Sequence, residues 1–255
     1  MTKKQQTYAK RFEEVGYDLD ELNRMLMGID KGTDRPVWHT SGFEHPNVPV
    51  IPNDSGKLDF YSWGLIPPWV KGTRNVIEIS NKTLNAKCET IFEKPSFEEA
   101  ARFKRCLVLI DGFFEHHHKN GKVQPYYISL KNGSPMALAG LWQERIDRLE
   151  GNVRRTLSIV TTRANDMMSD IHNNPKLKSP RMPVILTRDS EALWMTNEEV
   201  DEKEVEHVFE PFDQSEMDAY RVMPIRGKLY TGNIPKRIER VGIDSDNEQL
   251  SLFDV

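Results

Sequence analysis

Glu115 is the residue whose type and position most clearly suggest chemistry in this sequence. It lies near the end of an apolar, strand-like run over residues 105–117, in which both alternating sets of side chains are largely apolar. A strand of that kind is central in a sheet, where a carboxylate must be paired and can then donate or accept a proton. The alternative is a glutamate at a strand end that faces water, the common place for this residue type.

A run of three histidines and the separate His172 follow the glutamate. His116, His117 and His118 are adjacent, and because neighbouring strand residues point to opposite faces, at most the first and third could share a metal ion. We favour a solvated hairpin end, and we predict neither a metal nor a cofactor. His172 stands apart in a loop before a basic stretch that ends at Arg181, where it could face an anion or have a structural role.

Residues 63–69 place two tryptophans, Trp63 and Trp69, around a glycine and two prolines. Proline holds such a segment extended. Aromatic rings fixed in this way could form a shelf on which a nucleobase stacks, at about 1–3 kcal/mol per base. The alternative is a pair of tryptophans that fill the core.

The elements that must position these residues are mainly strands. Asn-Gly pairs at 120–121 and 132–133 separate apolar runs, a pattern typical of hairpins, and predict three consecutive strands at 105–117, 123–130 and 135–142. Two more strands are predicted at 156–162 and 182–186, and short helices at 18–27, 96–103, 164–172, 189–195 and 198–209. Ser96 and Glu99 match a capping box for the second helix. The sequence therefore predicts one α+β domain around an antiparallel sheet that curls or closes.

Composition narrows the class of protein. The 255 residues contain two cysteines, Cys88 and Cys106, too few for a disulfide framework, and no run of about 20 apolar residues that could cross a membrane. The net charge of −4 hides an asymmetry, since residues 189–219 hold 12 acidic residues and one basic residue, which leaves a net charge of +7 on the rest of the chain. A basic face for nucleic acid and two merely solvated surfaces are equally compatible with that pattern. We expect a cytoplasmic, nucleoid-associated monomer.

Five motifs in this order resemble the SRAP family, the SOS response-associated peptidases. They are Trp63-Gly-Leu-Ile-Pro-x-Trp69, Leu84-Asn-Ala-Lys-Cys-Glu-Thr90, Arg105-Cys-Leu-Val-x-x-Asp-Gly-Phe-Phe-Glu115, Thr161-Thr-x-Ala-Asn165, and Ile171-His172 followed by Arg181-Met-Pro-Val-Ile185. Each motif alone is weak, but the set spans most of residues 60–190. The resemblance implies one compact α+β domain, over residues 1–240, with a strongly curved, mostly antiparallel, barrel-like sheet and short peripheral helices.

The resemblance also implies a function. Family members bind single-stranded DNA and recognise abasic sites, and an N-terminal cysteine forms a thiazolidine cross-link with the ring-opened sugar. A peptidase activity that removes residues ahead of that cysteine is attributed to them as well. The residues that match the family's functional positions are Asn85, Glu115 and His172 for catalysis, and Trp63, Pro67, Trp69, Lys87 and Arg181 for DNA binding.

Three positions depart from the family's pattern. Residue 2 is Thr2 rather than cysteine, so we expect either a start a few residues upstream, which we favour, or a loss of the covalent chemistry. Lys87 replaces an arginine and keeps the charge without the bidentate fork. His116 replaces an aromatic residue. A cysteine peptidase that uses Cys106 or Cys88 is a poor alternative, because Cys106 is in the middle of an apolar strand.

Residues 241–255 are expected to form a flexible acidic tail. Its end, Gln249-Leu250-Ser-Leu252-Phe253, resembles the pentapeptide that binds the bacterial sliding clamp. In that mode the apolar side chains enter a groove and the glutamine makes polar contacts. The alternative is a terminus that docks on its own domain, and the alternative function for the whole chain is a non-catalytic adaptor between single-stranded DNA and the clamp.

Overall fold

The computed structural model describes residues 37–146, 151–227, 230 and 232–241. The helix predicted at 18–27, position 2 and the C-terminal tail lie outside these residues. No helix in the described ranges is both long and apolar enough to cross a membrane.

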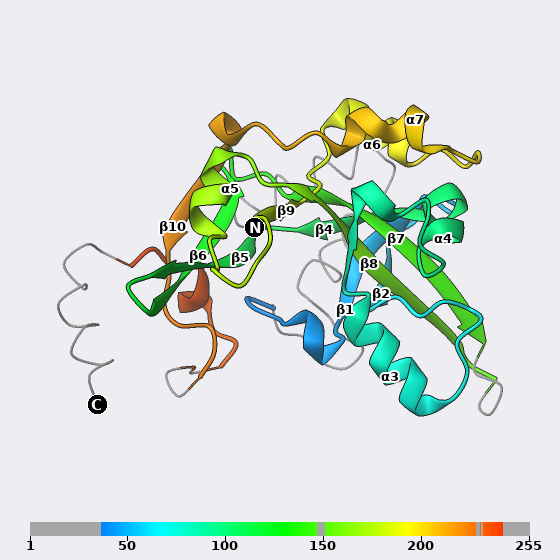
Figure 1. Cartoon of the computed structure of the whole chain (residues 1–255), viewed down its shortest axis with the longest axis horizontal. Helices are drawn as coiled ribbons and strands as arrows, with labels where there is room; N and C mark the ends of the chain where they lie inside the picture. Colours follow the sequence, from blue (N-terminus) through cyan, green and yellow to red (C-terminus); the bar gives the residue numbers. More distant parts are fainter. Residues whose placement is uncertain (1–36, 147–150, 228–229, 231, 242–255) are drawn as a thin grey trace.

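Five strands close into a barrel. They are β1 (Asn47–Pro52), β2 (Asp59–Trp63), β4 (Arg105–Ile110), β7 (Met136–Ile146) and β8 (Val153–Arg163). The order is β2-β1-β4-β7-β8, and β2 pairs back onto β8 in parallel, which closes the ring (Figure 1). Two short strands, β3 (Asn85–Lys87) and β9 (Arg181–Pro183), also pair with β8. The expected strongly curved, mostly antiparallel sheet is therefore confirmed.

A second, three-stranded sheet lies beside the barrel (Figure 1). It contains β5 (Phe113–Lys119), β6 (Lys122–Leu130) and β10 (Met217–Arg221). The single strand predicted over residues 105–117 is thus wrong, because the chain leaves the barrel after β4 and enters this second sheet at β5. The hairpin predicted at residues 120–121 joins β5 to β6, whereas the one at 132–133 is wrong, since β6 and β7 belong to different sheets.

Short helices surround the two sheets. They are α3 (Thr73–Lys82), α4 (Glu98–Phe103), α5 (Asp166–Ile171), α6 (Arg188–Trp194) and α7 (Glu202–Val205). Short 3-10 helices occur at Gly42–Glu44, Cys88–Thr90, Glu206–Phe209, Gln214–Glu216 and Pro235–Ile238. The capping box predicted at Ser96 is wrong, because α4 has Phe97 at its N-cap position and no side-chain cap.

Two apolar clusters follow the alternation of the barrel strands. One takes a side chain from each of the five strands, including Val50, Tyr61, Val108, Leu138 and Leu157, and so fills the inside of the barrel. The other lies between the outer face and α4, α6 and α7, which cover the barrel together in Figure 1. The side of the barrel that faces α5 and the second sheet carries the candidate site.

Candidate active site

Glu115 and His172 come together from different elements. Glu115 lies on β5, and His172 ends α5, where its backbone N–H donates to the Met168 carbonyl at 2.7 Å. The Glu115 Oε2 atom is 3.6 Å from His172 Nδ1, and the two side chains are 24% and 21% exposed. The fold thus holds a carboxylate and an imidazole side by side and partly exposed, an arrangement that candidates for acid–base chemistry need.

Side-chain bonds fasten α5 to β5 around this pair. Asn165 caps α5 by accepting from the Met168 N–H at 2.9 Å. Beyond the helix, Asn173 Oδ1 accepts from the His118 N–H at 2.6 Å, and Asn173 Nδ2 donates to the His118 carbonyl at 3.1 Å. The Glu115 Oε1 atom accepts from the His116 N–H at 2.8 Å, which fixes the rotation of the carboxylate.

Two backbone contacts of Arg181 bear on the proton of His172. The Nδ1 atom lies 2.7 Å from the Arg181 carbonyl oxygen and 3.3 Å from the Arg181 backbone nitrogen, whose N–H points at it. The shorter contact favours a proton on Nδ1 donated to the carbonyl, because two acceptors at that distance would repel. The neutral ring therefore keeps its lone pair on Nε2. That nitrogen is the one that can accept a proton in this arrangement.

Three of the predicted residues follow one another along β8. The parallel register sets Trp63 beside Leu157, Asn85 beside Ile159, and Lys87 beside Thr161. Since side chains alternate along a strand, these three point to the same face. Asn85 and Lys87 are exposed there, and Trp63 is half-buried with its Nε1 donating to the Leu84 carbonyl at 2.7 Å.

Arg181 connects this row to the contact between Glu115 and His172. Its Nε donates to Thr161 Oγ1 at 3.2 Å, while Thr161 Oγ1 in turn donates to the Ala86 carbonyl at 3.3 Å. Asn85 is therefore adjacent in sequence to Ala86, from which contacts through Thr161 and Arg181 lead to His172. Nη1 and Nη2 of Arg181 donate to Oε1 and Oε2 of Glu89, at 2.9 and 2.8 Å. The carboxylate thus occupies the guanidinium that the family resemblance assigns to a phosphate.

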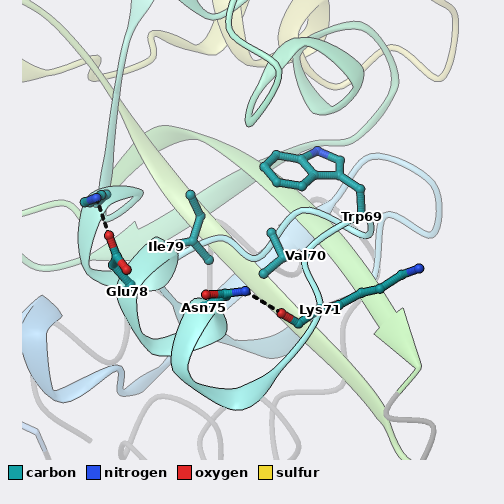
Figure 2. Close-up of a pocket in the computed structure, with 7 residues that line it drawn as sticks. Trp69, Val70, Lys71, Asn75, Glu78 and Ile79 are labelled. Atoms are coloured by element: carbon teal, nitrogen blue, oxygen red, sulfur yellow. Dashed lines mark hydrogen bonds and ion pairs between the residues drawn. The ribbon is translucent and has the colours of Figure 1, made fainter.

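Trp69 and Pro67 lie on the segment between β2 and α3. Pro67 is buried, whereas Trp69 is 56% exposed and borders a hollow of about 520 Å³ against α3. The hollow is lined by Trp69, Val70, Lys71, Asn75, Glu78, Ile79 and Lys82. Figure 2 shows the indole of Trp69 at one side of this hollow and Ile79 of α3 at another.

Comparison with known proteins agrees with the motifs. A family profile described as "SOS response associated peptidase (SRAP)" matches residues 2–227. The chain belongs to the SRAP family. The chain is 38% identical over 225 residues to "Abasic site processing protein YoqW" of Bacillus subtilis, covering 87% of this chain and 94% of that protein. It is 28% identical over 272 residues to "Abasic site processing protein YMR114C" of Saccharomyces cerevisiae, covering 93% and 69%.

A solved structure shares the fold of this SRAP chain. A protein from Bacteroides thetaiotaomicron superposes with a TM-score of 0.79 at 32% identity, covering 92% of this chain and 96% of that one. The similarity extends over both sheets, since it covers nearly the whole chain.

Sequence reasoning did not assign a role to three residues of the site in this SRAP chain. Glu89, Thr161 and Asn173 hold Arg181 and β5 in place. The first two stand inside the motifs that carry the resemblance, so the motifs could have pointed to them, while Asn173 gave no signal. Among the described residues, no group of three or more histidine, cysteine or acidic side chains could hold a metal ion.

His116 gives a pH-dependent prediction. Burial, with the nearby positive charges of Arg226, His118, His39 and His172, lowers its pKa from 6.5 to about 4. Between these two values the unfolded chain binds the proton more readily than the folded one, so the free energy of unfolding should fall as the pH falls from 6.5 towards 4. Replacing His116 by Phe should flatten this dependence, measured as urea midpoints across that range. The exposed His207→Asn variant is the control, and an equal slope in His116→Phe and the wild type would contradict the prediction.

Proposed function

We propose that this chain recognises abasic sites in single-stranded DNA and becomes covalently attached to them through an N-terminal cysteine, in a form that carries one. The contact between Glu115 and His172 supports this proposal most directly, because a condensation with an aldehyde needs a group that moves protons. The printed names of the relatives, abasic site processing proteins, point to the same substrate. We also propose the family's removal of residues ahead of the cysteine.

The proposed reaction is balanced by simple proton transfers. The α-amine of the cysteine adds to the aldehyde carbon of the open sugar, and the carbonyl oxygen takes up protons and leaves as water. The thiolate then adds to the same carbon, and the proton lost by the thiol ends on the ring nitrogen of the thiazolidine. Glu115 and the free Nε2 of His172 are the groups in this site that can carry these protons.

The remaining residues would hold the DNA strand. Asn85 is assigned to the amine and sugar oxygens, and Lys87, exposed on the same face, to a phosphate. Trp63, Pro67 and Trp69 would hold the strand open at the lesion. Arg181 has one N–H of its guanidinium left for a phosphate, since the other four are used by Glu89 and Thr161.

A cross-linking assay tests the function. A form with Met-Cys placed ahead of Thr2 is incubated with a single-stranded oligonucleotide that contains one abasic site, and is then run on a denaturing gel. We expect a retarded band that survives denaturation, absent with an intact oligonucleotide. With Thr2 as the first residue, the amine alone can form a Schiff base, which needs borohydride to survive the gel. The absence of a stable band from the cysteine form would reject the covalent function.

Trp69 is predicted to contribute to DNA affinity. Its exposed ring can stack on a base, so Trp69→Ala should weaken binding of single-stranded DNA by about 1–3 kcal/mol. Fluorescence anisotropy with a labelled oligonucleotide measures this loss. Ile146→Ala, which removes another exposed apolar side chain from β7, is the control. Equal affinities for Trp69→Ala and the wild type would remove Trp69 from the interface.

A second candidate function is a non-catalytic adaptor between single-stranded DNA and the sliding clamp, favoured by the peptide at residues 249–253. Gln249, Leu250, Leu252 and Phe253, which lie outside the described residues, would bind the sliding clamp. Replacing Leu252 and Phe253 by Ala should abolish capture by immobilised bacterial clamp, with Ser251→Ala as the control. Undiminished capture would show that this peptide is not the clamp ligand.

A further inference from the structure

Glu89 and Arg181 form a two-pronged ion pair between β3 and β9, one strand on each side of β8. Glu89 follows β3 directly in the 3-10 helix Cys88–Thr90, and Arg181 is the first residue of β9. Both guanidinium ends meet the carboxylate, at 2.9 and 2.8 Å. Hydrogen bonds with Arg181 lower the pKa of Glu89, so the pair is charged at neutral pH.

The same arginine is also fixed on its other side. Its Nε donates to Thr161 Oγ1 at 3.2 Å, and its Nη2 donates to the Thr161 carbonyl at 2.7 Å. The Arg181 side chain is 16% exposed, against 53% for Glu89. An arginine with four of its five N–H groups engaged has little freedom to swing out towards a ligand.

The His172 ring contacts the backbone of Arg181. The Arg181 carbonyl oxygen lies 2.7 Å from His172 Nδ1, the Arg181 backbone nitrogen lies 3.3 Å from it, and Glu115 Oε2 lies 3.6 Å from it. The shorter contact favours a proton on Nδ1 that the carbonyl accepts. β9 has three residues, so its ladder alone gives the first residue few restraints. The side-chain bonds of Arg181 to Glu89 and Thr161 supply restraints at the point where the imidazole is held.

We propose that Glu89 is a positioning residue for the acid–base pair. Its carboxylate fixes Arg181, whose carbonyl keeps the proton of the neutral His172 ring on Nδ1 and leaves Nε2 free to accept one. This inference rests on the proposed function, because it gives a reason for the geometry of the same site. It also explains why the arginine assigned to phosphate is already occupied by a carboxylate.

The first measurement needs no DNA. Long-range ¹H–¹⁵N correlation spectra of the imidazole side chains report which nitrogen of a neutral His172 carries the proton. We expect the Nδ1–H form in the wild type and a mixture of the two forms in Glu89→Gln, which keeps the shape but loses the charge and one acceptor. Glu89→Asp, which keeps the charge, should restore part of the Nδ1–H population. Glu93→Gln, an exposed glutamate four residues further on, is the matched control.

The second measurement uses the cysteine-bearing form and abasic DNA. Glu89→Gln should slow cross-linking by about tenfold or more, with the affinity for intact DNA unchanged. An unaltered His172 tautomer in Glu89→Gln would overturn the proposal. So would tighter DNA binding with a steeper salt dependence, since Glu89 would then be masking a phosphate site on Arg181. A changed tautomer in a chain that never cross-links would reject the proposed function and leave the positioning role standing.

Discussion

Replacing Glu115 by Gln is expected to slow cross-link formation by about a hundredfold or more, within the range that general acid–base catalysis contributes. Glutamine has nearly the same shape and can still accept the His116 N–H through its Oε1 atom, a bond of 2.8 Å in the wild type. It cannot take up or release a proton, so the steps in which water leaves and the ring closes lose their proton carrier. The measurement is a single-turnover time course on the cysteine-bearing form.

Two controls separate this effect from a general disturbance. Glu144→Gln changes an exposed carboxylate on β7 that pairs with Arg155, and it should cross-link at the wild-type rate. The affinity of Glu115→Gln for intact single-stranded DNA should also stay at the wild-type value, because a carboxylate and a phosphate are both negatively charged and Glu115 therefore does not hold the DNA backbone. Equal rates for Glu115→Gln and the wild type would show that Glu115 carries no proton in the reaction.

Local signals in the sequence were sufficient for several elements. Asn120 and Gly121 have φ angles of 52° and 75°, the left-handed backbone that a two-residue hairpin requires, so the pair predicts the β5–β6 turn for a physical reason. The helix predicted at 164–172 is present as α5, where Asn165 at the N-cap position accepts from the Met168 N–H. Short-range chemistry of this kind is readable without knowing the fold.

The break inside residues 105–117 depends on a distant contact. A Cβ atom at Gly112 would lie 2.3 Å from the Ile128 carbonyl oxygen, so the chain passes close to β6 at that point and changes sheet. The alternation of apolar residues continues across the break, so the sequence pattern predicts one strand instead of two. The helix α3 was missed because it is short and mostly polar, with three apolar residues, Val76, Ile77 and Ile79, among its ten, and Ser80 as its one buried residue.

In the candidate site too, local motifs indicate individual residues, whereas contacts between distant segments appear only in the structure. The motifs name Glu115, His172, Asn85 and Arg181, and the structure brings the first two into contact. The ion pair of Arg181 joins residues 92 positions apart, and nothing in either segment indicates the partner of the other. Motif resemblance therefore names candidate residues without indicating what each one contacts.

Replacing the buried Arg105 by Met is expected to destabilise the fold by about 3–5 kcal/mol, a large part of the stability of a domain this size. Arg105 is 0% exposed, and burial lowers its pKa to about 10, so it is charged at neutral pH. Its guanidinium donates to five backbone carbonyls, those of Ala101, Arg102, Trp194, Thr196 and Glu198. These oxygens close α4 and the end of α6 onto β4, and methionine would leave several of them buried without a donor.

The neighbouring Arg102 is the control that separates the loss of a surface ion pair from the loss of the buried hydrogen bonds of Arg105. Its side chain lies at the surface, 3.9 Å from Glu98 and 3.7 Å from Glu199, where ion pairs contribute about 0–1 kcal/mol. Arg102→Met should therefore unfold at nearly the wild-type temperature, while Arg105→Met should unfold roughly 10 °C lower in a thermal scan followed by circular dichroism. Arg105→Lys should be almost as unstable as Arg105→Met, because an ammonium group has three donors and cannot span carbonyls on two sides. If lysine restores the wild-type temperature, positive charge rather than the five-carbonyl geometry holds these elements together.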